Sequence, residues 1–165
     1  VPDKFFHKDP SKALNIEGDI KKAFDIIDDV IVLFEIPDGS CDGILASHIL
    51  EHFPDWQIPL ILQVWYRKLK VGGKLWVYVP DIKAAMLAFL EGTIDEDVFL
   101  NMLFGLARVQ RGQVWQAHRT GFWYERLVKV LQGVGFSVVG RIPSDMFPGR
   151  PRHSMEIGVE AERRK

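Results

Sequence analysis

A short run of histidine and glutamate side chains is the part of the sequence best suited to chemistry. Residues 47–53 have the sequence SHILEHF and directly follow the apolar run 42–46. On an α-helix, His48 and His52 would lie on one face and could bind zinc while Glu51 acted as a base. Alternatively the run marks the end of a buried strand, where open α/β sheets bind their ligands.

The zinc alternative is the weaker of the two. The spacing His48-x-x-Glu51-His52 is formally that of inverted zinc peptidases, but the pattern is short and matched easily by chance. Pro54 ends or disturbs a helix within a turn of His52, and a third protein ligand is not identified. We therefore predict no metal site, keep a zinc peptidase as a remote alternative, and expect Glu51 and His52 to cap and pack a short helix.

The surrounding elements alternate between strand and helix, which is typical of an α/β fold. Apolar runs bounded by Gly and Pro predict buried strands over 42–47 and 74–79, separated by a helix over 58–69. Asp81 is expected to cap the next helix. The remaining predicted elements are helices over 81–90, 98–109 and 121–132, the last stopping at Gly133, and strands over 136–142 and 155–161.

Two ordered motifs give the chain a family resemblance. Residues 36–53, IPDGSCDGILASHILEHF, resemble the fourth-strand region of class I S-adenosylmethionine-dependent methyltransferases. Residues 69–75, LKVGGKL, are similar to the turn into the family's fifth strand, with Val71 in place of the usual proline. Residues 117–136 and 155–161 are similar more loosely, so the resemblance covers about residues 15–161.

The resemblance implies one methyltransferase-like domain over residues 1–165. Its fold would be Rossmann-like, with a mostly parallel sheet and an antiparallel terminal strand, and its cofactor would be S-adenosylmethionine. The family's first strand carries a glycine-rich loop, and this pattern is missing before Glu17, since Gly18 is the only glycine in the first 38 residues. Either the chain begins after that strand or it is a diverged member without the loop.

The resemblance also implies roles for individual residues. Glu17 would accept hydrogen bonds from both ribose hydroxyls, as a carboxylate can do for a vicinal diol. Asp29 would face the adenine amino group, and Val30 would offer its backbone amide to the ring. The residues at the end of the strand over 42–47 would complete the cofactor site: Ala46, Ser47 and His48.

Methyl transfer needs little from the protein beyond alignment and proton removal, because the sulfonium donor is already activated. His48 and His118 are the candidate bases, since an imidazole titrates near neutral pH. The alternative for each is a structural histidine. A domain that keeps the fold but serves only as a binding or interaction module is the second functional hypothesis.

Composition limits the partners. The single cysteine fits a cytoplasmic protein. No apolar run approaches the roughly 18–20 residues that a membrane span requires, so no span is expected. The near-neutral pI of 6.6 disfavours general nucleic-acid binding and leaves a small-molecule methyl acceptor, with self-association left open. The first 60 residues are acidic and the last 65 basic, so an anionic acceptor is one candidate. The arginines that could bind such an acceptor are Arg108, Arg111, Arg119, Arg150 and Arg152.

Overall fold

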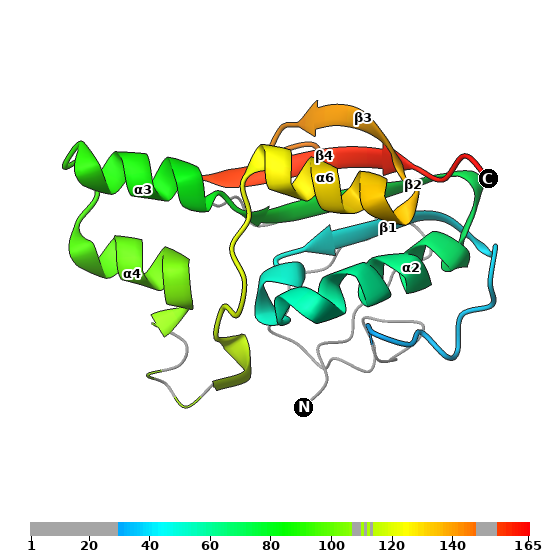
Figure 1. Cartoon of the computed structure of the whole chain (residues 1–165), viewed down its shortest axis with the longest axis horizontal. Helices are drawn as coiled ribbons and strands as arrows, with labels where there is room; N and C mark the ends of the chain where they lie inside the picture. The colour runs from blue at the N-terminus through cyan, green and yellow to red at the C-terminus, as the bar shows by residue number, and fades with distance from the viewer. Residues whose placement is uncertain (1–29, 107–109, 111, 113, 148–154) are drawn as a thin grey trace.

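A four-stranded sheet in the order β1-β2-β4-β3 forms the centre of the molecule (Figure 1). The computed structural model describes residues 30–106, 110, 112, 114–147 and 155–165. The strands are β1 (Cys41–Ser47), β2 (Leu69–Pro80), β3 (Ser137–Ile142) and β4 (Glu156–Glu162). β1 and β2 are parallel, and β4 runs antiparallel to both β2 and β3. The predicted α/β fold with an antiparallel terminal strand is confirmed.

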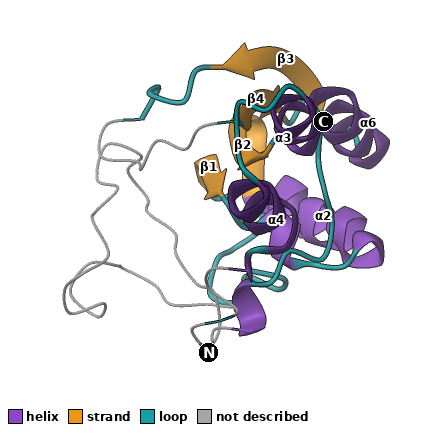
Figure 2. Ribbon diagram, turned by 90° about the vertical axis from the view of Figure 1, so that its left-hand side faces the viewer, coloured by secondary structure: helices purple, strands orange, loops and turns teal. Residues whose placement is uncertain are grey.

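Two amphipathic helices cover the same face of this sheet (Figure 2). They are α2 (Ile58–Lys68), which connects β1 to β2, and α6 (Tyr124–Val134), which precedes β3. Each helix buries apolar residues at helical spacing against the sheet, among them Trp65 on α2 and Leu127 and Leu131 on α6. No helix among the described residues is long and apolar enough to cross a membrane.

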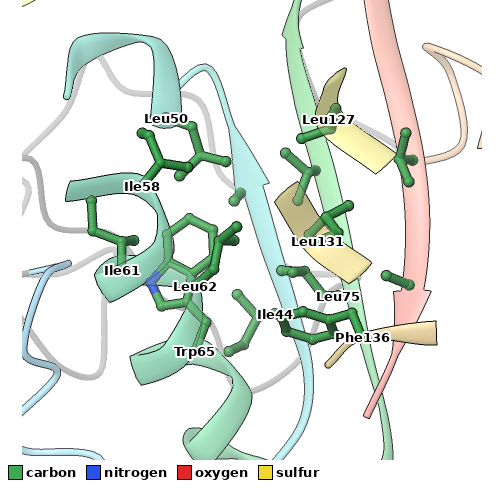
Figure 3. Close-up of a cluster of buried hydrophobic side chains, with 14 of the residues drawn as sticks. Ile44, Leu50, Ile58, Ile61, Leu62, Trp65, Leu75, Leu127, Leu131 and Phe136 are labelled. Atoms are coloured by element: carbon green, nitrogen blue, oxygen red, sulfur yellow. The ribbon is translucent and has the colours of Figure 1, made fainter. Parts of the chain in front are cut away.

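The core lies between these two helices and the sheet (Figure 3). Ile44 from β1 and Leu75 from β2 are almost completely buried and face the helical layer. Burial of such side chains contributes roughly 1.5–3 kcal/mol each relative to exposure. The other side chains labelled in this cluster are Leu50, Ile58, Ile61, Leu62, Trp65, Leu127, Leu131 and Phe136.

A second pair of helices lies at the carboxyl end of β2 (Figure 1). These are α3 (Ile82–Leu90) and α4 (Glu96–Phe104). The carboxylate of Asp81 accepts a hydrogen bond from Ala84 N at 3.1 Å, so the predicted cap is confirmed. The sheet therefore passes directly into a helical hairpin at the edge where β1 also ends.

Two predicted helix ends differ from the structure. α4 ends at Phe104 because Gly105 adopts the left-handed conformation with φ of 69°, so the helix expected over 98–109 is interrupted. α6 runs through Gly133 to Val134 and ends at Gly135, whose φ is 114°. In each case the glycine with a positive φ, rather than the nearest glycine or the apolar pattern, sets the end.

The glycine pair in β2 fits the predicted turn. Gly72 has a φ of 80°, a conformation that other residues rarely adopt. A Cβ on Gly73 would lie 2.9 Å from the carbonyl oxygen of Lys70 and 3.1 Å from that of Cys41. The strand begins at Leu69, whereas the sequence predicted a start at residue 74. Both glycines therefore lie inside the strand.

The single cysteine opens β1. Cys41 is half-buried, and it pairs in parallel register with Leu69 of β2. Burial raises the pKa of its thiol above the ordinary value.

The remaining short elements in the part of the chain that the structure describes are three 3-10 turns. η2 (Leu50–His52) and η3 (Asp55–Gln57) lie between β1 and α2. η4 (Val114–Gln116) precedes the segment that leads into α6.

Candidate functional site

The chain leaves β1 through a residue with unusual backbone geometry. His48 follows the strand with a φ of 53°, and its N–H donates to the carbonyl oxygen of Tyr78 at 2.9 Å. A single 3-10 turn, η2, comes next in place of an α-helix. His48 and His52 therefore do not share a helical face, and the helix that a zinc peptidase would need is not formed.

The imidazole of His48 lies between two carboxylates. Its Nε2 is 2.9 Å from Oε2 of Glu156, and its Nδ1 is 3.1 Å from Oε1 of Glu51. Glu156 opens β4 and pairs in register with Pro80, which brings it to the carboxyl end of β2. Burial lowers the pKa of His48, but Glu156 and Glu51 outweigh this effect and raise the pKa to about 9. The ring is therefore a cation at neutral pH.

Glu51 is a buried carboxylate, with a relative exposure of 1%. Neither of its oxygens accepts a well-aligned hydrogen bond within the described residues, and Oε1 has the ion-pair contact with His48. Its backbone carbonyl accepts from the N–H groups of Arg119 at 2.7 Å and Thr120 at 3.3 Å. The turn after β1 is thus joined to the segment before α6.

That segment brings a third imidazole to the site. The rings of His118 and His52 meet edge to face, with centroids 5.2 Å apart. The Nδ1 of His118 lies 2.8 Å from the carbonyl oxygen of Met102, and that of His52 lies 3.4 Å from the carbonyl oxygen of Ala117. Burial lowers the pKa of His118, so this ring is neutral at pH 7.

These five side chains form what we call the polar cluster: His48, Glu51, His52, His118 and Glu156. It lies at the carboxyl ends of β1 and β2, the edge at which open α/β sheets bind ligands.

Further contacts hold the segment before α6 against this edge. Asp55 accepts hydrogen bonds from Thr120 and from Arg126, and this pairing lowers the pKa of Asp55. Phe122 forms an isolated parallel bridge with Asp81, and its carbonyl accepts from Ile82 N at 2.9 Å. The segment that follows His118 is therefore held against this edge of the sheet.

The predicted cofactor residues are only partly described. Ser47 ends β1 opposite Tyr78, while Ala46 is 2% exposed and pairs with Val77. Val30 is 3% exposed, and its carbonyl accepts from the indole of Trp65 at 3.1 Å. With their side chains in the core, Val30 and Ala46 can meet a ligand only through their backbone. Glu17 and Asp29 lie outside the described residues, so their convergence with Ser47 stays a prediction.

Sequence reasoning singled out His48 and His118 but missed how Glu51, His52 and Glu156 join them. Glu156 is 108 residues from His48 along the chain. Its contact depends on the antiparallel register of β4, for which the spacing of residues contains no signal. Glu51 and His52 were expected to cap a helix, whereas Glu51 turns into the interior.

Comparison with known proteins agrees with this architecture. Residues 9–77 match the family model described as a methyltransferase domain, which includes β1, α2 and most of β2. No curated protein matches the sequence.

Solved methyltransferases share the fold at low sequence identity. An S-adenosylmethionine-dependent methyltransferase of Thermotoga maritima is 18% identical with a TM-score of 0.54; the match covers 87% of this chain and 66% of that one. One from Methanosarcina mazei is 18% identical, has a TM-score of 0.54 and is matched over 83% and 65%.

The 1,6-didemethyltoxoflavin-N1-methyltransferase of Burkholderia thailandensis, solved with S-adenosylhomocysteine, is 14% identical. Its TM-score is 0.52, and the match covers 83% of this chain and 49% of that one. The chain thus spans between half and two thirds of the length of these three structures. The chain therefore shares the fold of these S-adenosylmethionine-dependent methyltransferases, and its residues 9–77 are similar to the methyltransferase domain family.

Proposed function

We propose that this chain transfers the methyl group of S-adenosylmethionine to a small-molecule acceptor. The observation that supports this most is the position of the polar cluster. Three of its residues, His48, Glu51 and His52, directly follow β1 inside the segment matched by the methyltransferase model, and the cluster lies at the edge where such a sheet binds ligands. The similarity of residues 9–77 to the methyltransferase domain family supports the reaction class, and the cluster supports an acceptor-binding role for this end of the sheet.

The described residues fit the cofactor at one end. Ser47 is only partly buried at the tip of β1, and the neighbouring cluster includes two carboxylates that favour a cationic sulfonium nearby. We assign the contacts with the nucleoside to Glu17 and Asp29, and a contact with the adenine ring to the backbone of Val30. The remaining contacts with the cofactor are assigned to the tip of β1: Ala46, Ser47 and His48. When bound, the cofactor would supply an activated methyl group.

Of the two candidate bases, the electrostatics favour His118. His48 is already protonated between its two carboxylates, so it would hold charge and orient groups rather than accept a proton. His118 is neutral, and its Nδ1 donates to the Met102 carbonyl, which leaves Nε2 able to accept one. His118 would take the proton that the acceptor oxygen or nitrogen loses on methylation, while His48 would keep its own proton.

An anionic acceptor is supported by one described residue. Arg119 is exposed next to His118 in sequence, where its guanidinium could bind a phosphate or carboxylate. Arg108, Arg111, Arg150 and Arg152 lie outside the described residues.

Calorimetric titration with S-adenosylmethionine tests the function. We expect saturable binding to the parent chain, weakened about tenfold or more by Glu17→Ala and by Asp29→Ala, since each removes hydrogen bonds to the nucleoside. Asp42→Ala is the matched control, because Asp42 is exposed and its carboxylate pairs with Lys70.

The same titration separates catalysis from the second hypothesis. If millimolar S-adenosylmethionine and S-adenosylhomocysteine give no heat with the parent chain, the proposal is wrong, and the result favours a non-catalytic binding or interaction module. Equal weakening by all three variants would instead contradict the assignment of Glu17 and Asp29.

A further inference from the structure

We propose that Glu51, His52 and His118 form a binding site for a divalent transition metal, with zinc as the best match. This inference goes beyond the proposed methyl transfer, which requires no metal. It differs from the peptidase pattern in the sequence, because His48 is not a ligand and His118 comes from a segment far along the chain.

The geometry of the three side chains is the first argument. One potential ligand atom from each of Glu51, His52 and His118 lies within 4.8 Å of the other two. Zinc binds imidazole nitrogen and carboxylate oxygen at about 2.0–2.2 Å, so tetrahedral ligands stand roughly 3.4 Å apart. Side-chain movements of about 1 Å would bring the three donors to that separation. Two imidazoles and one carboxylate leave a fourth position open, as in catalytic zinc sites.

The hydrogen bonds of the two histidines are the second argument. A carbonyl oxygen can only accept, so the contacts to Met102 and Ala117 place the proton of each ring on Nδ1. Each Nε2 then keeps a free lone pair. Histidines that bind metals nearly always donate their other N–H to a carbonyl or carboxylate in this way, which fixes the tautomer and the ring orientation.

The burial of Glu51 is the third and independent argument. A carboxylate at 1% exposure loses its hydration, and its two oxygens have no well-aligned hydrogen bond within the described residues. The contact with His48 engages Oε1 and leaves Oε2 for another partner. A metal ion on Oε2 would satisfy it, while His48 would support the carboxylate from behind.

The charges around the site allow a cation. His48 faces both Glu51 and Glu156, so it does not present uncompensated positive charge to an ion bound at Glu51. Nitrogen donors favour zinc over magnesium or calcium, which prefer all-oxygen sites.

Binding would also affect the proposed reaction. The Nε2 of His118 cannot hold a metal and accept a proton at the same time. The metal-loaded chain would therefore use His118 as a ligand, and the metal-free chain would keep it as a base.

The test is an isothermal calorimetric titration of chelator-treated protein with zinc chloride in the absence of S-adenosylmethionine. We expect about one zinc ion per chain, and a loss of affinity of at least about tenfold in each of Glu51→Gln, His52→Asn and His118→Asn. Titration with cobalt(II) should give the visible absorption of a four-coordinate nitrogen and oxygen site in the parent chain only.

Asp42→Asn is the matched control, because it removes one exposed carboxylate away from the site and should leave zinc affinity unchanged. Far-ultraviolet circular dichroism shows which variants fold; if one unfolds, Glu51→Asp, which keeps the charge but shortens the side chain, replaces it. No zinc binding by the parent, or equal affinity in all variants, would overturn the proposal. Both outcomes are independent of cofactor binding, so failure here leaves the methyltransferase proposal standing.

Discussion

His48 has two carboxylate neighbours, and this pairing makes the stability of the fold depend on pH. The pKa of His48 is about 9 in the folded chain against an ordinary value of 6.5. Because the folded value is higher, its stabilisation is complete below pH 6.5 and is lost as pH rises through about 9. The side chain is 23% exposed, which reduces the effect, so we expect a loss of roughly 1–3 kcal/mol.

Urea denaturation of the parent chain and of His48→Asn across this pH range measures the effect. Asparagine tolerates the positive φ at this position and does not titrate, so the free energy of unfolding of the variant should be flatter with pH. Parallel curves for the two proteins would show that His48 does not gain its proton on folding. Titrating groups that do not contact His48 contribute to both curves and cancel in the difference.

At the scale of the elements, β4 has little room for side chains at one position. A Cβ on Gly158 would lie 2.6 Å from the carbonyl oxygen of Ile142 and 2.6 Å from Cε1 of Tyr78. Gly158→Ala should therefore destabilise the sheet by about 1–3 kcal/mol, because β4 is paired on both sides and cannot move away.

Gly140→Ala in β3 is the comparison for that substitution. A Cβ there meets nothing within 4 Å, so the free energy of unfolding should change by less than about 0.5 kcal/mol. Both values come from denaturant melts at one pH. Similar losses in the two variants would mean that strand glycine in general, rather than the close approach at Gly158, determines the cost.

The elements also show where sequence patterns succeed. α2 was predicted within a residue at its end because its apolar stripe and its flanking segments are local signals. The end of α4 was not predicted correctly, because the apolar pattern continues past Gly105, whereas the backbone of Gly105 adopts the left-handed conformation. α6 passes through Gly133 and ends at Gly135, the glycine of the two that has a positive φ, and the apolar pattern does not distinguish between them.

At the scale of the whole molecule, the fold was more predictable than the site. Strand and helix order follows from local periodicity, and two motifs placed β1 and the start of β2 in a known arrangement. The polar cluster draws on three separate segments: the run from His48 to His52, the segment before α6, and the first residue of β4. Only the register of the completed sheet brings Glu156 to His48, so a buried polar site of this kind needs the folded structure.

The half-buried thiol at the start of β1 makes the local opening of this strand measurable by chemical labelling. Cys41 is the only cysteine in the sequence, and burial raises its pKa, so its nucleophilic form is scarce in the native protein. A small alkylating reagent should label native protein much more slowly than urea-unfolded protein, with product measured by intact-mass spectrometry. A native labelling rate equal to the unfolded one would show that this end of the strand is already open. Pulse labelling thus measures the rate at which the start of β1 opens locally, without an introduced probe.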